Sequence, residues 1–259
     1  MNEQISQFYD DIAPVYDNAM DKGFINGVIS RRFQEHLVAQ FRTATQVLDV
    51  GCGVGTDAVF LGNKGVKVYG FDISAGMIEV AKRKAADAGL EESMVEFSTG
   101  DATDLSRLPN AGFDGAYANF NVLNHLPDVG GFAKTLSEKL LPGAPVVVTM
   151  MNRVCLPEVA GYMARLRFTT AARKFCSRQN TLAMRMRLFF PAETARLFAP
   201  YFSLQSIEGF GLLVPPSQLY SGKYFRHFFE TMAALERPLL RLFPFYNFCD
   251  TYILILKRK

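Results

Sequence analysis

Three glycines at alternating positions are the clearest chemical feature of this sequence. They stand at 51, 53 and 55 in VLDVGCGVGTDAVFL, where an apolar strand pattern runs directly into a helical one. Glycine lets the backbone turn tightly and lets a ligand approach where a Cβ atom would block it, and the first turn of the following helix has unpaired N–H groups. The segment therefore predicts a small-molecule site between a strand and a helix.

The spacing of these glycines bears on the kind of ligand. Dinucleotide-binding loops need G-x-G-x-x-G to hold a pyrophosphate, but Thr56 stands where the third glycine of that pattern belongs. The loop therefore favours a ligand other than NAD.

The cysteines and histidines give no sign of a metal site. Cysteines stand at 52, 155, 176 and 249, without a C-x-x-C pair, and the histidines at 36, 125 and 227 lie far from them in the sequence. Structural zinc sites and disulfide scaffolds need closely spaced ligands or paired cysteines. We expect no metal, and packing rather than nucleophilic chemistry for Cys52.

Short strand patterns alternate with helical patterns around the glycine loop. The strands are predicted over 47–50, 66–71, 94–98, 113–119 and 145–150, and further strands over 203–211 and 250–259. A helix is predicted after Ser74, a suitable N-cap, with Gly89 as its stop, and Pro191 opens another. This alternation is typical of a doubly wound α/β fold with a mostly parallel sheet.

Three segments surround this α/β pattern. An apolar residue at every fourth position from Ile25 to Phe41 predicts an amphipathic helix near the N-terminus, with His36 beside its apolar stripe in a structural role. Residues 151–190 are rich in Arg and Lys, and residues 212–248 are rich in Phe and Tyr. We predict this division: a helical lid over 1–43, an α/β core over 44–150, a basic cap insertion over 151–190, and the end of the core sheet over 191–259, interrupted by an aromatic helical insertion over 212–248.

Composition limits the class of protein. The chain has 259 residues, of which 49% are hydrophobic, so it can form a full core. Its apolar stretches are too short to cross a bilayer and its polar N-terminus does not resemble a secretory signal, so a cytoplasmic location is expected. A net charge of +3 is too small to indicate nucleic-acid binding.

Three motifs in order give the chain a family resemblance. D-V-G-C-G-V-G, then Y-G-F-D at the end of the second strand, then G-D-A after the third, resemble the class I S-adenosylmethionine-dependent methyltransferases of the small-molecule type. The resemblance implies a Rossmann-like sheet of seven strands with the last antiparallel, helical lid and cap insertions, S-adenosyl-L-methionine as cofactor and S-adenosyl-L-homocysteine as product.

The resemblance also implies roles for individual residues. Asp72 matches the acid that binds the ribose hydroxyls, Asp101 with its neighbour Ala102 the position at the adenine amino group, and Ile73 and Met77 the apolar positions beside the adenine ring. Asp49 would hold the methionine ammonium or anchor the glycine loop. The implied cofactor-binding residues are Tyr9, Tyr16, Asp49, Gly51, Gly53, Gly55, Asp72, Ile73, Met77, Asp101, Ala102 and Asn119.

Methyl transfer from a sulfonium needs an oriented acceptor and, where the acceptor has a proton to lose, a base. The loop after the fourth strand offers His125 as that catalytic base or as a structural residue, with Asn121 and Asn124 as hydrogen-bond donors. His227 has a weaker claim to face a pocket. The two insertions predict a lipophilic or aromatic small-molecule acceptor, and the basic one also fits peripheral contact with a membrane surface or an acyl carrier. The oligomeric state stays open.

Two other functions fit the same motifs. One is a methyltransferase acting on RNA or protein, against which NFNV stands where an N-P-P-Y type motif is expected. The other is a non-catalytic scaffold that keeps the cofactor-binding fold.

Overall fold

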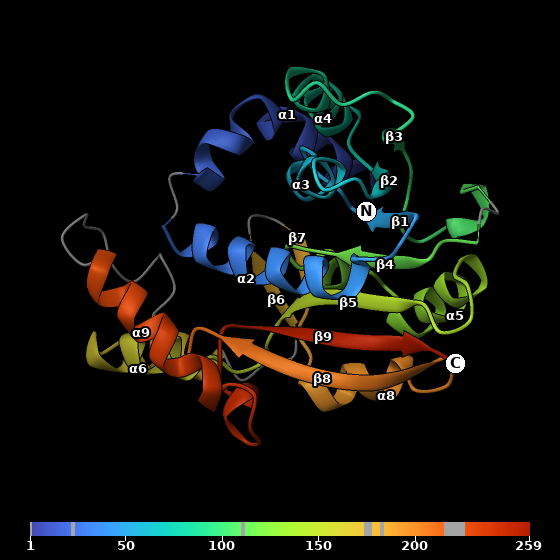
Figure 1. Ribbon diagram of the computed structural model, residues 1–259. Helices are drawn as coiled ribbons and strands as arrows, with labels where there is room; N and C mark the ends of the chain where they lie inside the picture. The colour runs from blue at the N-terminus through green and yellow to red at the C-terminus, as the bar shows by residue number, and fades with distance from the viewer. Residues whose placement is uncertain (1, 22–23, 110–111, 174–177, 182–183, 215–225) are drawn as a thin grey trace.

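A seven-stranded sheet organises the chain. In this computed structural model the strands lie in the order β3-β2-β1-β4-β5-β9-β8 (Figure 1). The pairs from β3 to β5 are parallel, and β9 runs antiparallel to both β5 and β8. The predicted doubly wound, mostly parallel sheet with an antiparallel last strand is confirmed.

The structure describes residues 2–21, 24–109, 112–173, 178–181, 184–214 and 226–259. The strands of the main sheet are β1 Gln46–Val50, β2 Lys67–Asp72, β3 Val95–Thr99, β4 Gly115–Ala118, β5 Pro145–Met151, β8 Phe202–Phe210 and β9 Thr251–Arg258, and a separate pair is β6 Arg178–Thr181 with β7 Met184–Arg187. The helices are α1 Asn2–Asp21, α2 Phe24–Phe41, α3 Thr56–Gly62, α4 Ala75–Asp87, α5 Val129–Lys139, α6 Leu156–Ala164, α7 Phe168–Arg173, α8 Pro191–Phe198 and α9 Arg226–Leu239, with short 3-10 turns η1 Leu105–Arg107, η2 Val122–His125 and η5 Phe245–Asn247.

Local sequence signals set several of these boundaries. The Ser74 hydroxyl accepts a hydrogen bond from the Met77 N–H at 3.0 Å and so caps α4 as predicted. Gly89 follows that helix with a left-handed φ of 72°, and Pro191 occupies the first turn of α8. Such signals act within one turn of the chain, which is why the sequence alone predicts them.

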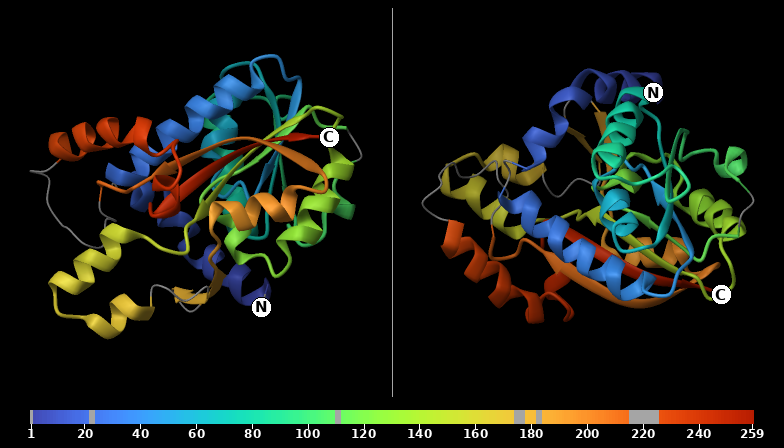
Figure 2. Two further views of the ribbon diagram at one scale, coloured as in Figure 1. Left: turned by 90° about the horizontal axis from the view of Figure 1, so that it is seen from below. Right: turned by 45° about the horizontal axis from the view of Figure 1, so that its top comes forward.

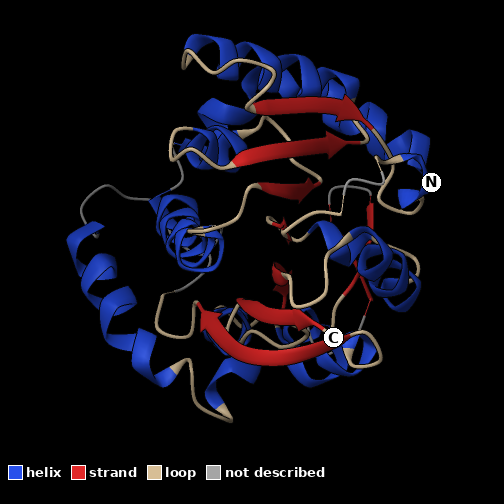
Figure 3. Cartoon of the chain, turned by 45° about the vertical axis from the view of Figure 1, so that its right-hand side comes forward, coloured by secondary structure: helices blue, strands red, loops and turns tan. Residues whose placement is uncertain are grey.

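Helices cover both faces of the sheet (Figure 3). One apolar layer joins the sheet to α2, α3 and α4, and the other joins it to α5 and α8. The stripe predicted on the second helix is part of the first layer, because Phe33, Leu37 and Phe41 are all fully buried. Helix α2 therefore belongs to the core. Within the predicted lid 1–43, it is α1 that lies outside this layer, where it packs on α4.

The two insertions project beyond the same end of the sheet, where the parallel strands finish (Figure 2). The basic one forms α6, α7 and the β6–β7 pair, and the aromatic one contains α9. Within the described ranges, no helix combines the length and hydropathy needed to cross a membrane.

Candidate cofactor site

A cavity of about 380 Å³ opens where β1, β2, β3 and β4 end. Loops after these four strands form its floor, and side chains of α1 and α2 complete its wall. It lies at the edge where open α/β sheets bind ligands, because the carboxyl ends of parallel strands converge there. Every residue implied for cofactor binding lines this cavity except Gly55, and His125 lines it too.

The glycines of the loop serve different purposes. Gly53 has a φ of 52°, and a Cβ atom built there would meet no atom within 4 Å, so its backbone faces open space in the cavity. At Gly55 the same atom would come within 2.7 Å of the Phe97 ring, so that glycine permits packing of the loop on the core instead. Only the first kind of position lets a ligand approach the backbone.

Asp72 ties the glycine loop to the second strand. One carboxylate oxygen accepts from the Gly53 N–H at 2.9 Å and the other from the Ser74 N–H at 3.0 Å. Burial raises the pKa of Asp72, while these backbone hydrogen bonds lower it. Since a carboxylate can accept about four hydrogen bonds, lone pairs of Asp72 remain for hydroxyl groups of a ligand in the cavity.

The next part of the wall suits a flat apolar ring. Ile73, Met77 and Ala102 line it, and Met77 is only 1% exposed. Asp101 stands beside them, and one of its oxygens accepts from the Thr103 N–H at 2.8 Å. The arrangement places an apolar surface next to a carboxylate that can accept from an amino group.

Two buried carboxylates lie below the glycine loop. Burial raises the pKa of Asp49 well above its ordinary value, and the charge of Asp57 raises it further. Asp57, which the motif analysis did not identify, accepts from Gln34 Nε2 at 3.0 Å and from Asn119 Nδ2 at 2.7 Å. Burial raises its pKa also, against the lowering effect of these two amides. Nothing in the sequence pairs residues 34, 57 and 119, so this contact required the folded chain.

Asn119 lines the cavity, but its side chain hydrogen-bonds to other residues of the protein. Its amide nitrogen donates to Asp57, and its oxygen accepts from the Phe120 N–H at 2.8 Å and from the Thr149 hydroxyl at 3.2 Å. These bonds hold the next two residues at left-handed φ values of 49° for Phe120 and 66° for Asn121. Consecutive non-glycine residues in this region are rare and strained, and such strain is concentrated at functional sites.

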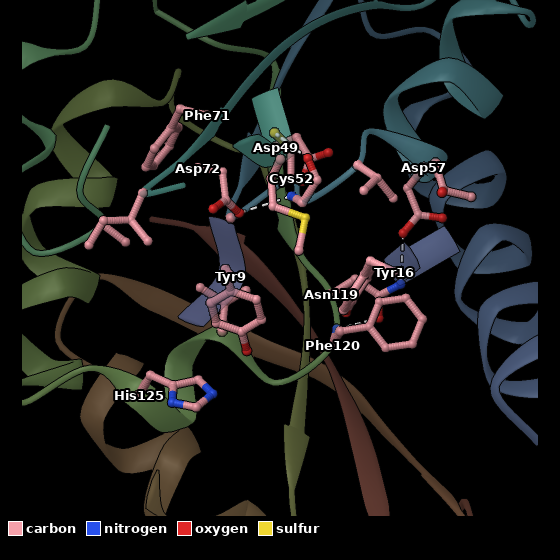
Figure 4. A pocket seen from close by; sticks show the side chains of 18 of the residues that line it. Tyr9, Tyr16, Asp49, Cys52, Asp57, Phe71, Asp72, Asn119, Phe120 and His125 are labelled. Atoms are coloured by element: carbon pink, nitrogen blue, oxygen red, sulfur yellow. Dashed lines mark hydrogen bonds between the residues drawn. The ribbon is translucent and has the colours of Figure 1, made fainter. Parts of the chain in front are cut away.

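His125 closes the side of the cavity opposite the glycine loop (Figure 4). Its Nδ1 atom is buried, and among the described residues nothing hydrogen-bonds to it. Burial lowers the pKa of His125, so the ring is neutral at neutral pH. The neighbouring Asn124 is instead a structural residue, since its amide donates to the Arg187 carbonyl at 2.7 Å and accepts from the Met151 N–H at 2.9 Å.

Helices α1 and α2 supply side chains from outside the core motifs. Tyr9 and Tyr16 line the cavity as predicted, and burial, followed by the charge of Asp72, raises the pKa of Tyr9. Arg31 lines it as well and is the only lysine or arginine among the described lining residues. No local signal marks Arg31, because the pattern that predicts its helix consists only of the apolar stripe.

The insertions contribute less to this cavity than expected. No described residue of 152–190 or 212–248 lines it. The side chain of His227 lies outside the described set, as do those of several of the predicted aromatics. His36 lies 3.3 Å from Glu208 on β8, consistent with its expected structural role. Among the described residues, no group of three or more potential ligands could hold a metal.

Comparison with known proteins gives a consistent picture. A family model described as a methyltransferase domain matches residues 47–143, the segment that carries the glycine loop and the acids. The chain is similar to a 2-phytyl-1,4-naphtoquinone methyltransferase of Synechococcus elongatus, at 30% identity over 60% of this chain and 66% of that protein. It is also similar to a ubiquinone biosynthesis O-methyltransferase of Azorhizobium caulinodans, at 32% identity over 55% of each. The chain spans about half to two thirds of the length of the curated relatives it matches.

Solved structures share the fold at low sequence identity. A [4+2]-cyclase superposes over 100% of this chain and 97% of its own, with a TM-score of 0.67 and 17% identity. A magnesium protoporphyrin IX methyltransferase from Synechocystis with bound SAH superposes over 91% of this chain and 86% of its own, with a TM-score of 0.56 and 18% identity. The same architecture thus serves different reactions, and the chemistry must be argued from the residues of the site.

Proposed function

We propose that this chain, which belongs to the class I S-adenosylmethionine-dependent methyltransferases, transfers a methyl group to O, N or C of a small lipophilic or aromatic acceptor. The observation that supports this most strongly is the grouping of Gly53, Asp72 and Met77 in one cavity. A glycine backbone that faces open space, a carboxylate with lone pairs available and an apolar slot suit a nucleoside with a ribose diol and a flat base. They suit a dinucleotide less well, because its pyrophosphate is bound by a G-x-G-x-x-G loop.

Different residues of the cavity would bind different parts of the cofactor. Asp72 would accept hydrogen bonds from the ribose hydroxyls, and Ile73, Met77 and Ala102 would hold the adenine ring, with Asp101 at its amino group. The backbone at Gly51 and Gly53 would lie along the methionine part, supported from below by Asp49. Bound S-adenosylmethionine supplies an electrophilic methyl group on a positively charged sulfur.

Arg31 could bind the negatively charged carboxylate of the same cofactor. Arg31, on α2, is the only lysine or arginine among the described residues that line the cavity. A carboxylate is the group that a guanidinium binds best, through two parallel hydrogen bonds. We assign Arg31 to the methionine carboxylate.

His125 is the proposed base. Its buried, unpartnered Nδ1 and its lowered pKa keep it neutral and able to take a proton at neutral pH. It would remove the proton from an acceptor hydroxyl or amine held between His125 and Phe120. For an acceptor without such a proton, the same ring would only position the substrate.

The acceptor class follows from the cavity and from the relatives. Beyond the cofactor residues, the remaining lining side chains are mostly apolar, among them Val122, Phe120 and Leu126. The matched relatives act on quinones and related ring compounds according to their names. A ring with an apolar substituent therefore suits this part of the cavity.

The turn between α6 and α7 supports membrane contact for such an acceptor. Met163, Leu166 and Phe168 are 47%, 75% and 55% exposed there, and Arg165 and Arg167 lie beside them on the surface. Exposed apolar side chains interleaved with arginines suit an anionic lipid surface, where the apolar groups insert and the cations stay at the headgroups. An acyl carrier protein would need the cations but not the exposed apolar groups.

Cosedimentation tests this surface. The wild-type protein should pellet with vesicles containing anionic lipid, and much less with neutral vesicles. Leu166→Ser with Phe168→Ser should abolish the effect, while Val15→Ser, at another exposed apolar position, should not. Binding to an acyl carrier protein without vesicle binding would contradict the membrane assignment.

The central proposal is tested by product formation. Purified protein is supplied with labelled S-adenosylmethionine and an extract of lipophilic metabolites, and both released S-adenosylhomocysteine and labelled acceptor are measured. Stoichiometric formation of the two is expected. Tight cofactor binding with no product from any extract would instead support the scaffold alternative, and label in RNA or protein would support the macromolecular one.

A further inference from the structure

A second, smaller cavity adjoins the first. It holds about 100 Å³ and is lined by Ile29, Asn119, Phe120, Asn121, Thr149, Met151, Asp250 and Thr251. Asn119 and Phe120 line both cavities, so the two cavities adjoin at these residues. The second cavity thus lies where the ends of β4 and β5 meet the start of β9.

The polar atoms facing this cavity are biased toward acceptors. Asn121 Oδ1 is buried and has no hydrogen-bond partner among the described residues. Asp250 also lines the cavity, and its Oδ2 atom accepts from the Thr251 hydroxyl at 3.5 Å. The Thr149 hydroxyl is already used, since it donates to Asn119 and lies 3.4 Å from the Asn121 N–H. Leaving a buried acceptor unpaired is unfavourable, and a donor bound in the cavity would remove that cost.

The strained backbone at Asn121 is a second, independent sign that this cavity is a functional site. Asn121 is held at φ 66° by the Asn119 and Thr149 contacts, and it lines the small cavity. A strained conformation that the surroundings fix in place persists where the site needs the geometry. Asn121 is therefore positioned as an acceptor, whereas the sequence suggested it as a donor.

The volume limits what can bind. One water molecule takes about 30 Å³ in the liquid, so the small cavity has room for a polar substituent and not for a second ring. Ile29, Phe120 and Met151 close its apolar sides.

From these observations we infer that the small cavity recognises a hydrogen-bond donor, such as a hydroxyl group, on the acceptor whose ring lies in the large cavity. Asn121 Oδ1 accepts the donor's hydrogen, and the Asp250 carboxylate lines the same cavity as a charged acceptor beside it. This inference rests on the proposed methyltransferase function and adds a substituent to its substrate class. Asn121 and Asp250 are specificity residues here, and neither is assigned to the methyl-transfer step.

A matched pair of probes tests the inference. 1-Naphthol carries a donor, and 1-fluoronaphthalene has nearly the same shape without one. Binding of each to the full chain saturated with S-adenosylhomocysteine is measured by ligand-observed NMR titration. The wild type should bind 1-naphthol at least tenfold more tightly. Similar affinities for the two probes in the wild type would overturn the inference.

Two variants test whether the preference for 1-naphthol depends on Asn121 and Asp250. Asn121→Gly removes the acceptor while tolerating the left-handed backbone, and Asp250→Asn keeps the side-chain shape but removes the negative charge and replaces one acceptor oxygen with a donor. Each should reduce the preference for 1-naphthol at least fivefold, with unchanged affinity for 1-fluoronaphthalene and S-adenosylhomocysteine. Asn63→Gly, the same change at an exposed position outside both cavities, is the control. Full preference in both folded variants would also overturn the inference, whereas failure of the wild type to bind S-adenosylhomocysteine would instead remove the proposed function.

Discussion

The Asp10 carboxylate on α1 accepts a hydrogen bond from the Ser74 hydroxyl at 2.6 Å and another from the Gly76 N–H at 2.8 Å. The hydrogen bond from Ser74, followed by that from Gly76, lowers the pKa of Asp10. These contacts fasten α1 to the first turn of α4, beside the loop that carries Asp72. The same helix presents Tyr9 to the cavity. The lid and the cofactor loop are therefore coupled through one carboxylate.

Asp10→Ala should release α1 from α4. We expect the affinity for S-adenosylhomocysteine to fall about three- to tenfold, because two hydrogen bonds to a charged group hold the lid closed. Isothermal titration measures this. Asp11→Ala, which changes an exposed neighbour, should leave the affinity unchanged, and equal affinities for both variants would contradict the coupling.

Asp72→Ala should weaken cofactor binding by about 1–3 kcal/mol through loss of charge-assisted hydrogen bonds. Since the assignment concerns the ribose, adenosine should lose affinity as S-adenosylhomocysteine does, while Asp104→Ala, at an exposed acid, should affect neither. Unchanged binding of adenosine would refute the ribose role and leave Asp72 only as an anchor for Gly53.

The rate should depend on pH through His125. Because burial lowers its pKa, the rate should rise with pH through a midpoint below the ordinary histidine value of about 6.5 and level off near neutrality. In His125→Gln this acidic limb should disappear and turnover should fall about 10²–10⁴-fold, with cofactor affinity nearly unchanged. A variant that kept both the rate and the limb would show that His125 is structural.

Asn119→Ala should destabilise the fold. The change removes the amide that donates to buried Asp57 and the oxygen that holds the Phe120 N–H, so the free energy of unfolding should fall by about 1–3 kcal/mol. Chemical denaturation measures it. Asn63→Ala, at an exposed position, should cost much less, and a similar small loss in both variants would mean that the network contributes little.

Acid should weaken the contact between α9 and β8. Burial alone would raise the pKa of Glu208, but hydrogen bonds from His36 and Arg241, and the charges of His36 and Arg237, lower it to about 2. A lowered carboxyl pKa adds stability above the unfolded value of about 4.3, and this stability is lost as pH falls through the range from about 4 to 2. Glu208→Gln should be less stable at pH 7 and show a flatter acid dependence; an unaltered pH profile of thermal stability would contradict this.

Much of the fold could be predicted because its signals are local. The strand patterns, the Ser74 cap and Pro191 depend on neighbouring residues, and they lie where the sequence placed them. The sequence-based expectation that the insertions would line the pocket was less successful. Their described residues lie at the correct end of the sheet but outside the large cavity. The position of α9 depends on packing against α2 and β8, and that of β7 on packing against η2, rather than on local pattern.

The amino-acid order by itself determined a glycine turn, acids at strand ends and the alternation that brings those ends to one edge, since strand and helix periodicity are properties of adjacent residues. Tertiary structure alone decided that Gln34, Asp57 and Asn119 share hydrogen bonds, and that Asn121 and Asp250 face one small cavity. These partners are separated by tens of residues. Only the packing of α2 on one face of the sheet and the pairing of β9 with β5 bring them together.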